Sequence, residues 1–262
     1  MIYETIIFDV KDHVAYITLN RPDAANGVNM ALGKDLMHAA ICCDEDPEIR
    51  AVLLTGAGKM FSAGGDLKYF IDLGDELSSA LKEVTVYCHA ANSRFMRMNA
   101  PLITAVNGPA AGMGMSFALC GDMIIAAESA MFMAAYTAAG LSPDGGMTYL
   151  LPRKIGLART KELILTNRRL TAREALEWGL VNKVVPDDEL MKEAEALVKR
   201  LANGPTLSFG SVKRLLNETF SETLESQMEH EARGLVDMTK TKDAKEGIAA
   251  FIERRRPDFT GS

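Results

Sequence analysis

Two glycine-rich segments follow apolar runs and precede helical patterns. They are residues 61–67, FSAGGDL, and residues 106–116, VNGPAAGMGMS. Small residues let a ligand approach the backbone, and the first N–H groups of a helix have no partner within the helix. Two such N–H groups from different loops can stabilise an oxygen that develops negative charge. Each segment alone is better explained as a tight turn that packs a helix on a sheet, so only the pair indicates chemistry.

Neither glycine-rich segment matches a nucleotide-binding motif. Gly112-Met113-Gly114 lacks the third glycine of the dinucleotide fingerprint. No Gly-Lys-Ser/Thr follows a glycine and four spacer residues, as a phosphate-binding loop requires. Both kinds of nucleotide site are therefore excluded.

A single carboxylate stands in a third glycine-rich segment, residues 140–148, GLSPDGGMT. Asp144 lies just before an expected helix, where aspartate commonly serves as an N-cap. A carboxylate there could also take and return protons, and the two roles are compatible. Local sequence alone favours the cap.

The elements that must position these segments alternate between strands and helices. The apolar patterns predict strands at 2–9, 13–19, 51–55, 102–106 and 123–126, the first two joined as a hairpin at Lys11-Asp12. Helices are predicted to begin at Asp66 and to span 30–44, 79–98, 112–119, 157–165, 171–177, 187–203, 205–219, 221–237 and 242–254. Asp187 and Thr171 are the expected N-caps of two of them, Thr171 within a capping box. This order indicates an α/β fold with parallel strands, a core of residues 1–200 and a helical extension of residues 201–262.

The composition narrows the class of protein. The 262 residues carry a net charge of −6, which argues against nucleic-acid binding. No apolar stretch is long enough to span a membrane, and residues 1–19 are unlike a targeting peptide. The four cysteines form no metal-binding pattern and are expected to be buried, reduced thiols. We therefore expect a cytoplasmic protein without a metal and without nucleic-acid or membrane partners.

Six short segments, taken together and in order, resemble the crotonase (enoyl-CoA hydratase/isomerase) superfamily over nearly the whole chain. They are residues 19–22 (LNRP), 52–56 (VLLTG), 62–67 (SAGGDL), 105–108 (AVNG), 179–182 (GLVN) and 251–255 (FIERR). The resemblance implies a spiral of ββα units with a C-terminal helical trimerisation region, assembled as a homotrimer or as a hexamer made of two trimers. It also implies an acyl-CoA thioester substrate, with coenzyme A as part of that substrate and no separate cofactor.

The resemblance also implies roles for individual residues. The thioester oxygen would lie between the backbone N–H groups of Gly65 and Met113. The residues expected to hold the CoA substrate, in addition to Gly65 and Met113, are Ala24, Ala63, Gly64, Asp66, Leu67, Lys68 and Tyr136.

The acid and base of this chain differ from those of the family's hydratases. Those enzymes use two glutamates, and this chain has Ser116 and Tyr136 at the corresponding positions. Asp144 occupies instead the position of the single carboxylate in family isomerases, including those that act on ring-opened phenylacetyl-CoA derivatives. One carboxylate can move a double bond by taking a proton from C2 and returning one at C4. The resemblance therefore favours an isomerase in which Asp144, Gly65 and Met113 are catalytic.

Several alternatives remain open. The chain could be an enoyl-CoA hydratase in which Ser116 or Tyr136 holds the water, or a non-catalytic acyl-CoA-binding homologue. Dehalogenation is disfavoured, because the family's dehalogenases have a histidine eight residues before the proline that opens the next strand, and this chain has Ser93 at that distance from Pro101. His89 is expected to be an ordinary core or surface histidine. Residues 254–256 (RRR) are expected to be a solvated helix end, which could instead approach CoA phosphates.

The acyl pocket is expected to be apolar. The side chains that suggest this are Phe70, Leu73, Leu77, Leu81 and Val84.

Overall fold

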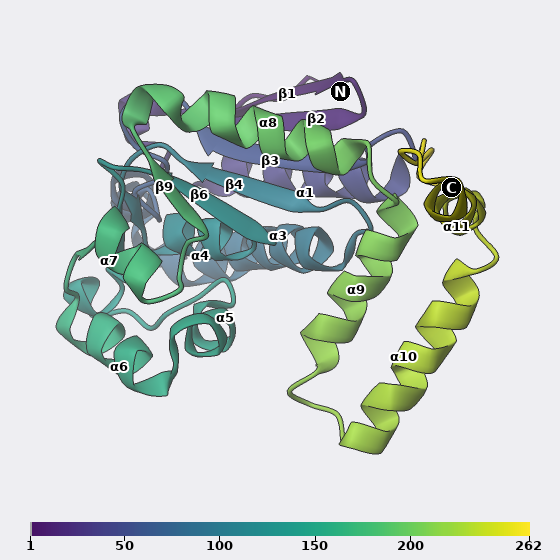
Figure 1. The fold of residues 1–262 in the computed structure, drawn as a ribbon. Coiled ribbons are helices and arrows are strands. Elements are labelled where there is room, and N and C mark those ends of the chain that lie inside the picture. The colour runs from purple at the N-terminus through teal and green to yellow at the C-terminus, as the bar shows by residue number, and fades with distance from the viewer. Residues whose placement is uncertain (1) are drawn as a thin grey trace.

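The computed structural model describes residues 2–262 and contains a six-stranded sheet in the order β1-β2-β3-β4-β6-β9. Its strands are β1 (Ile6–Lys11), β2 (Val14–Leu19), β3 (Ala51–Gly56), β4 (Leu102–Val106), β6 (Met123–Ala127) and β9 (Lys183–Val185). Only the β1–β2 pair is antiparallel, and the other four pairs are parallel. The expected α/β fold with parallel strands is therefore confirmed (Figure 1).

The predicted N-terminal hairpin forms, but its first strand runs from Ile6 to Lys11 rather than over 2–9, and the turn is one residue later than the predicted Lys11-Asp12. Asp12 and His13 connect the strands, with φ angles of 51° and 64°. A two-residue hairpin turn with positive φ at both positions matches the right-handed twist of the strands that it joins.

Helices cover both faces of the sheet. All six residues of β3 are buried, and successive side chains point to opposite faces. Ala51 and Leu53 pack in one apolar cluster with residues of α8 (Leu190–Ala202). Val52 and Leu54 belong to the larger cluster, which includes residues of α1 (Met30–Glu45) and α3 (Leu77–Arg97). Figure 1 shows α8 on one side of the sheet and α1 and α3 on the other.

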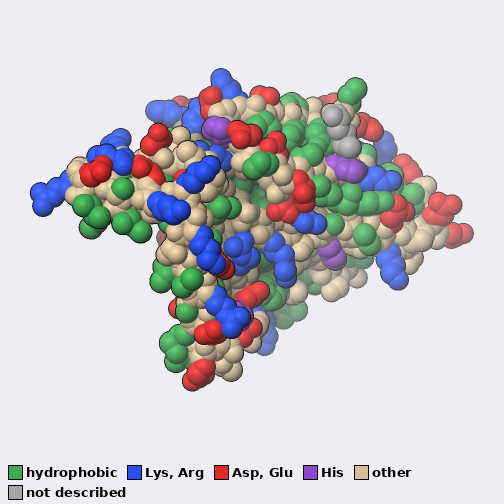
Figure 2. Space-filling view, turned by 90° about the vertical axis from the view of Figure 1, so that its right-hand side faces the viewer, with side chains coloured by type: hydrophobic (Ala, Val, Ile, Leu, Met, Phe, Trp, Pro, Cys, Tyr) green, Lys and Arg blue, Asp and Glu red, His purple; other side chains and the backbone are tan. Residues whose placement is uncertain are grey.

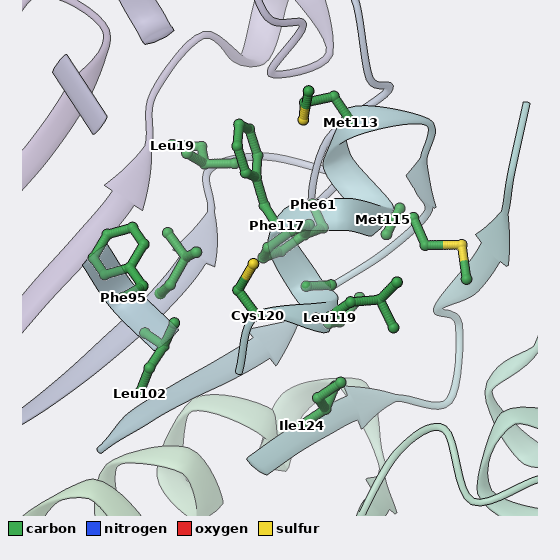
Figure 3. Packing of buried hydrophobic residues seen from close by; sticks show 14 of the residues in the cluster. Leu19, Phe61, Phe95, Leu102, Met113, Met115, Phe117, Leu119, Cys120 and Ile124 are labelled. Atoms are coloured by element: carbon green, nitrogen blue, oxygen red, sulfur yellow. The ribbon is translucent and has the colours of Figure 1, made fainter. Parts of the chain in front are cut away.

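A second, three-stranded sheet lies beside the helix that follows the second glycine segment. Its strands, in the order β5-β7-β8, are β5 (Ala110–Ala111), β7 (Met131–Met133) and β8 (Leu170–Thr171). Helix α4 (Met113–Leu119) starts directly after β5 and is buried at every position. Figure 3 shows Met113 at one end of α4, and Phe117 of the same helix next to Phe61 of the first glycine segment. The core therefore fixes the start of α4 relative to the first glycine segment.

The remaining helices complete the fold. They are α2 (Leu67–Asp72), α5 (Met147–Ile155), α6 (Leu157–Thr166), α7 (Ala172–Glu177), α9 (Thr206–Glu218), α10 (Leu224–Met238) and α11 (Lys242–Glu253), with short 3-10 turns at Pro22–Ala24, Gly74–Glu76, Thr137–Ala139 and Asp187–Glu189. Helices α9 and α10 extend away from the sheet, and α11 ends near the start of α9 (Figure 1). The division at residue 200 stays a prediction.

Helix α9 is joined to the core by a buried lysine. Lys213 Nζ donates to the carbonyl oxygens of Phe95 and Ala100, each at 3.0 Å, and lies 2.8 Å from Oδ2 of Asp122. Burial lowers the pKa of Lys213, and the charge of Asp122 opposes that effect. Because a buried ammonium group needs such partners, this contact ties the middle of α9 to α3 and to the segments that precede β4 and β6.

Two smaller predictions need correction. Asp187 does not cap a helix with its side chain, since its carboxylate accepts a hydrogen bond from the Ser129 N–H at 3.0 Å. All four cysteines are free, but Cys42 is exposed rather than buried. The capping box of Thr171 and Glu174 is confirmed. None of the helices within residues 2–262 has the length and apolar character needed to cross a membrane.

Candidate active site

The first glycine segment is held open by pairing with residue 28. The Val28 N–H donates to the Gly64 carbonyl at 2.7 Å, and the Asp66 N–H donates to the Val28 carbonyl at 2.9 Å. This parallel bridge leaves the intervening Gly65 N–H directed away from Val28. Within residues 2–262 the Gly65 N–H donates to no protein acceptor. The geometry therefore leaves one backbone donor free, as the resemblance implies.

The second glycine segment lies against the first. The Ala111 N–H donates to the Ser62 carbonyl at 2.9 Å. A Cβ on Gly64, whose φ is +93°, would come within 2.7 Å of the Ala111 carbonyl oxygen. Gly112, with φ +51° and ψ −126°, adopts a conformation that favours glycine and starts α4. The Met113 N–H is the first of that helix and finds no protein partner in the described chain.

Gly65 and Met113 line the same cavity, which has a volume of about 150 Å³. Most of its wall is apolar and comes from α2, α3 and the loop before α5. Phe70, Leu81, Val84 and Leu141 form part of that wall. The expectation of an apolar pocket bordered by α2 and α3 is thus confirmed for three of the five predicted side chains, whereas Leu73 and Leu77 pack against the core.

Asp144 also lines this cavity, and its carboxylate contacts a histidine. Oδ1 of Asp144 lies 2.5 Å from Nε2 of His89 on α3. The Asp144 side chain is 26% exposed and the His89 side chain 52% exposed. Asp144 does not cap α5, because Gly146 occupies the N-cap position and no side chain caps that helix. The N-cap interpretation of Asp144 is therefore wrong, and Asp144 forms part of the cavity wall from the loop before α5.

Ser116 and Tyr136 hold the backbone of Asp144. Ser116 Oγ donates to the Asp144 carbonyl at 2.8 Å, and the Tyr136 hydroxyl approaches the same oxygen at 3.5 Å. Burial raises the pKa of Tyr136, so its hydroxyl remains a neutral donor. A third contact comes from Asn92 Nδ2, which donates to the carbonyl of Gly145 at 2.9 Å. The residues at the two hydratase glutamate positions thus support the loop that carries the carboxylate.

The backbone beside Tyr136 is strained. Ala135, which lines the cavity, has a φ of 64°, a left-handed conformation that is uncommon for alanine. Such conformations persist where the surrounding structure enforces them, and they cluster at functional sites. The Tyr136 N–H donates to the Ala134 carbonyl at 2.9 Å across this turn. The turn therefore directs Tyr136 toward the Asp144 loop.

Some of the other predicted substrate-binding residues line the cavity and some do not. Ala63, Leu67 and Tyr136 line the cavity with Gly65 and Met113, and Leu67 is 56% exposed. Ala24, Gly64, Asp66 and Lys68 do not line it.

The structure gives local roles to some of the residues outside the cavity. Asp66 caps α2 through the Tyr69 N–H at 3.1 Å and pairs with Arg21 at 2.8 Å. In the basic tail, Arg255 pairs with Glu246 and Glu253, each at 2.6 Å. The expected contacts of these residues with CoA stay predictions.

The position of His89 beside Asp144 differs from the sequence prediction, which gives this histidine no role in the site. The available signal was its spacing: His89 and Asn92 are three residues apart, so they share one face of α3, and both contact the Asp144–Gly145 turn. The serine at position 93 therefore no longer argues against dehalogenation, because another histidine, His89, lies beside Asp144. Ser93 itself lines a surface hollow with Met37 and Arg94. Among residues 2–262, no three His, Cys, Asp or Glu side chains cluster as a metal site would require.

Comparison with known families identifies the family of this chain. The profile of the family described as enoyl-CoA hydratase/isomerase matches residues 9–262. The chain belongs to this family and has the crotonase fold, and it is an acyl-CoA enzyme of the hydratase/isomerase group.

Individual relatives have different activities in their names. The chain is 38% identical to 1,2-epoxyphenylacetyl-CoA isomerase of Escherichia coli, over 98% of this chain and 99% of the relative. It is 34% identical to 4-chlorobenzoyl coenzyme A dehalogenase-2 of an Arthrobacter species, over 92% of this chain and 87% of the relative. The crystal structure of an enoyl-CoA hydratase from Bacillus anthracis superposes with a TM-score of 0.93 at 34% identity, covering 99% of this chain and all of the other.

Proposed function

We propose that this protein is an enoyl-CoA isomerase that moves a carbon–carbon double bond in a 3-enoyl-CoA or in a thioester derived from phenylacetyl-CoA. The observation that carries the proposal is the position of one carboxylate, Asp144, on the cavity that the free N–H groups of Gly65 and Met113 also line. The substrate is an acyl-CoA thioester, and the apolar wall suits a hydrocarbon acyl group.

The proposed reaction needs one base and two backbone donors. The Asp144 carboxylate takes a proton from C2, and the electrons move onto the thioester oxygen as an enolate. The N–H groups of Gly65 and Met113 donate hydrogen bonds to that oxygen, where they stabilise the developing charge more than the ground-state carbonyl. The enolate collapses toward C4, which takes a proton from the Asp144 carboxylic acid. The double bond then lies between C2 and C3, and Asp144 is again a carboxylate.

Hydration is the weaker candidate because the two hydroxyls that could hold water are engaged. Ser116 and Tyr136 both direct their hydroxyls at the Asp144 carbonyl. Addition of water would also require a second acid or base on the water, and the hydratase glutamates are absent from these positions. A non-catalytic acyl-CoA-binding role is also weaker, because binding alone does not require the Asp144 carboxylate, paired with His89, on the cavity wall.

The test is Asp144→Asn, with Asp237→Asn on the exposed face of α10 as the matched control. The Asp144 variant should lose at least about 100-fold in double-bond shifting, the size of a typical acid–base contribution. Binding of a saturated acyl-CoA should persist, as measured by calorimetry, and the control should keep full activity. Isomerisation by Asp144→Asn at the wild-type rate would overturn the proposal. Faster hydration of a 2-enoyl-CoA, or chloride release from a 4-chlorobenzoyl thioester, would assign the wild-type site to another reaction.

For the whole protein we propose a homotrimer or a hexamer made of two trimers, located in the cytoplasm. Support for assembly comes from large apolar side chains exposed on α9–α11, among them Leu216 (64%), Leu235 (71%) and Phe251 (86%). Exposed apolar surface of this kind marks protein interfaces. A role in β-oxidation or fatty-acid metabolism would follow from the proposed substrate class.

A further inference from the structure

One face of α3 carries two polar side chains that contact successive residues of the loop bearing the carboxylate. His89 reaches the side chain of Asp144 at 2.5 Å, and Asn92 reaches the carbonyl of Gly145 at 2.9 Å. We propose that His89 and Asn92 are positioning residues for the base: His89 occupies Oδ1 of Asp144 so that Oδ2 is the oxygen that exchanges protons with the substrate. This inference rests on the proposed function and specifies how the base is aimed.

The contact between His89 and Asp144 defines which carboxylate oxygen is available. An ionised carboxylate only accepts hydrogen bonds, so Nε2 of His89 must carry a proton when Asp144 is the base. Hydrogen bonds to an ionised partner are short and directional. Oδ1 is then engaged on the α3 side, and only Oδ2 is free of a protein donor among the described residues. The free oxygen is the one that can meet a C2 proton.

Asn92 has a feature that packing alone does not account for. It is 5% exposed, and its Oδ1 has no hydrogen-bond partner in the described chain, although its Nδ2 donates to Gly145. An unpaired buried polar atom destabilises the folded state. An apolar residue would avoid that cost but could not donate to the Gly145 carbonyl, which the Asn92 amide does.

The turn itself leaves little freedom for other arrangements. Gly145 has a φ of +66°, and a Cβ there would come within 2.5 Å of Met113 Sδ and 2.8 Å of Ser116 Cβ. The turn is therefore seated directly on the first residues of α4, the helix that also supplies the Met113 N–H. Helix α4 supports the turn from one side and α3 from the other. The position of Asp144 relative to the Met113 N–H is therefore fixed by the same packing. A displacement of a catalytic group by about 1 Å can lower the rate roughly 100-fold.

The experiment compares His89→Ala, His89→Gln and Asn92→Leu with His13→Ala as the matched control. His13 is also a half-exposed histidine beside a carboxylate, with Nδ1 3.4 Å from Glu48, but it lies in the N-terminal hairpin. His89→Ala and Asn92→Leu should each lower kcat by about 10- to 100-fold while KM changes by less than about threefold, because the base is misaimed but binding is kept. His89→Gln should recover most of kcat, since its amide can donate to Oδ1.

The outcomes separate this inference from the proposed function. Exchange of the C2 hydrogens of a saturated acyl-CoA with deuterated water needs the base and the enolate donors, but no double-bond shift. Normal exchange and isomerisation in both His89→Ala and Asn92→Leu would overturn the positioning role and leave the isomerase intact. Equal losses in His89→Ala and His89→Gln would also overturn the role assigned to His89, because they would require the imidazole itself. A wild-type protein that exchanges C2 hydrogens but isomerises nothing would refute the proposed function, and its His89 variants would still test the positioning.

Discussion

At the scale of single residues, the site depends on backbone conformations that favour glycine. Gly64 combines a positive φ with direct contact to the second loop, and Gly112 has a positive φ at the start of α4. These conformations place the N–H groups of Gly65 and Met113 on one cavity. The side chain of Met113 is unimportant for such a donor, because the backbone supplies the hydrogen bond.

Gly64→Ala tests the contact between the two loops. We expect kcat/KM to fall by more than about tenfold and the protein to lose roughly 1–3 kcal/mol of stability, since the added Cβ meets the Ala111 carbonyl in a strained backbone. Gly156→Ala is the control, because Gly156 has a φ of +79° but no atom within 4 Å of an added Cβ. Gly156→Ala should unfold at a lower temperature than the wild type because of backbone strain, but it should keep its activity. Similar activity losses in both variants would mean that the loop contact is irrelevant.

At the scale of elements, α2 depends on Asp66, which both caps the helix and pairs with Arg21. Burial alone would raise the pKa of Asp66, but hydrogen bonds from the Tyr69 N–H and Arg21 and the charge of Arg21 outweigh it and lower the pKa. A lowered native pKa means that the ionised carboxylate stabilises the folded state. Because Arg21 also donates to the Gly27 carbonyl, the pair connects α2 to the loop next to Val28.

Asp66→Asn separates the ion pair from the cap, since asparagine is also a good N-cap. We expect a loss of about 1–2 kcal/mol at pH 7, measured by urea unfolding. The stabilisation is complete above the unfolded pKa of about 3.9 and is lost as pH falls through the lowered native value. The difference between the wild type and the variant should therefore shrink below about pH 4. A difference that stays constant down to pH 2 would exclude the Asp66 charge as its source.

At the scale of the whole molecule, α9–α11 carry apolar side chains that the chain itself does not cover. On the side of the molecule that bears α10 and α11, hydrophobic side chains reach the surface among charged ones (Figure 2). Phe251 and Ile252 are 86% and 74% exposed. An isolated monomer would leave this apolar surface in contact with water, which favours association.

Phe251→Glu should therefore weaken assembly. Sedimentation velocity is expected to show a trimer or hexamer for the wild type and smaller species for the variant, because a carboxylate would be buried in the interface. Ile7→Glu on the edge strand β1 is the control, as Ile7 is 53% exposed but remote in sequence from the C-terminal helices. A monomeric wild type would contradict the assembly outright.

The sequence by itself predicted the N-terminal hairpin, the strands β3, β4 and β6 and most of the helices, and it singled out Asp144 as the candidate carboxylate. It did not predict the short strands β5, β7, β8 and β9. Periodicity and glycine placement are local properties, so β4 and α3 were predicted to within two residues. The partner of Asp144 is not local: His89 is 55 residues away in the chain, and its sequence context predicts only an ordinary core or surface histidine. Only the tertiary structure decided that Asp144 leaves α5 uncapped, that Ser116 and Tyr136 support its backbone, and that α3 holds its carboxylate. Hydrogen bonds act over about 3 Å, and folding alone brings such distant residues within that reach.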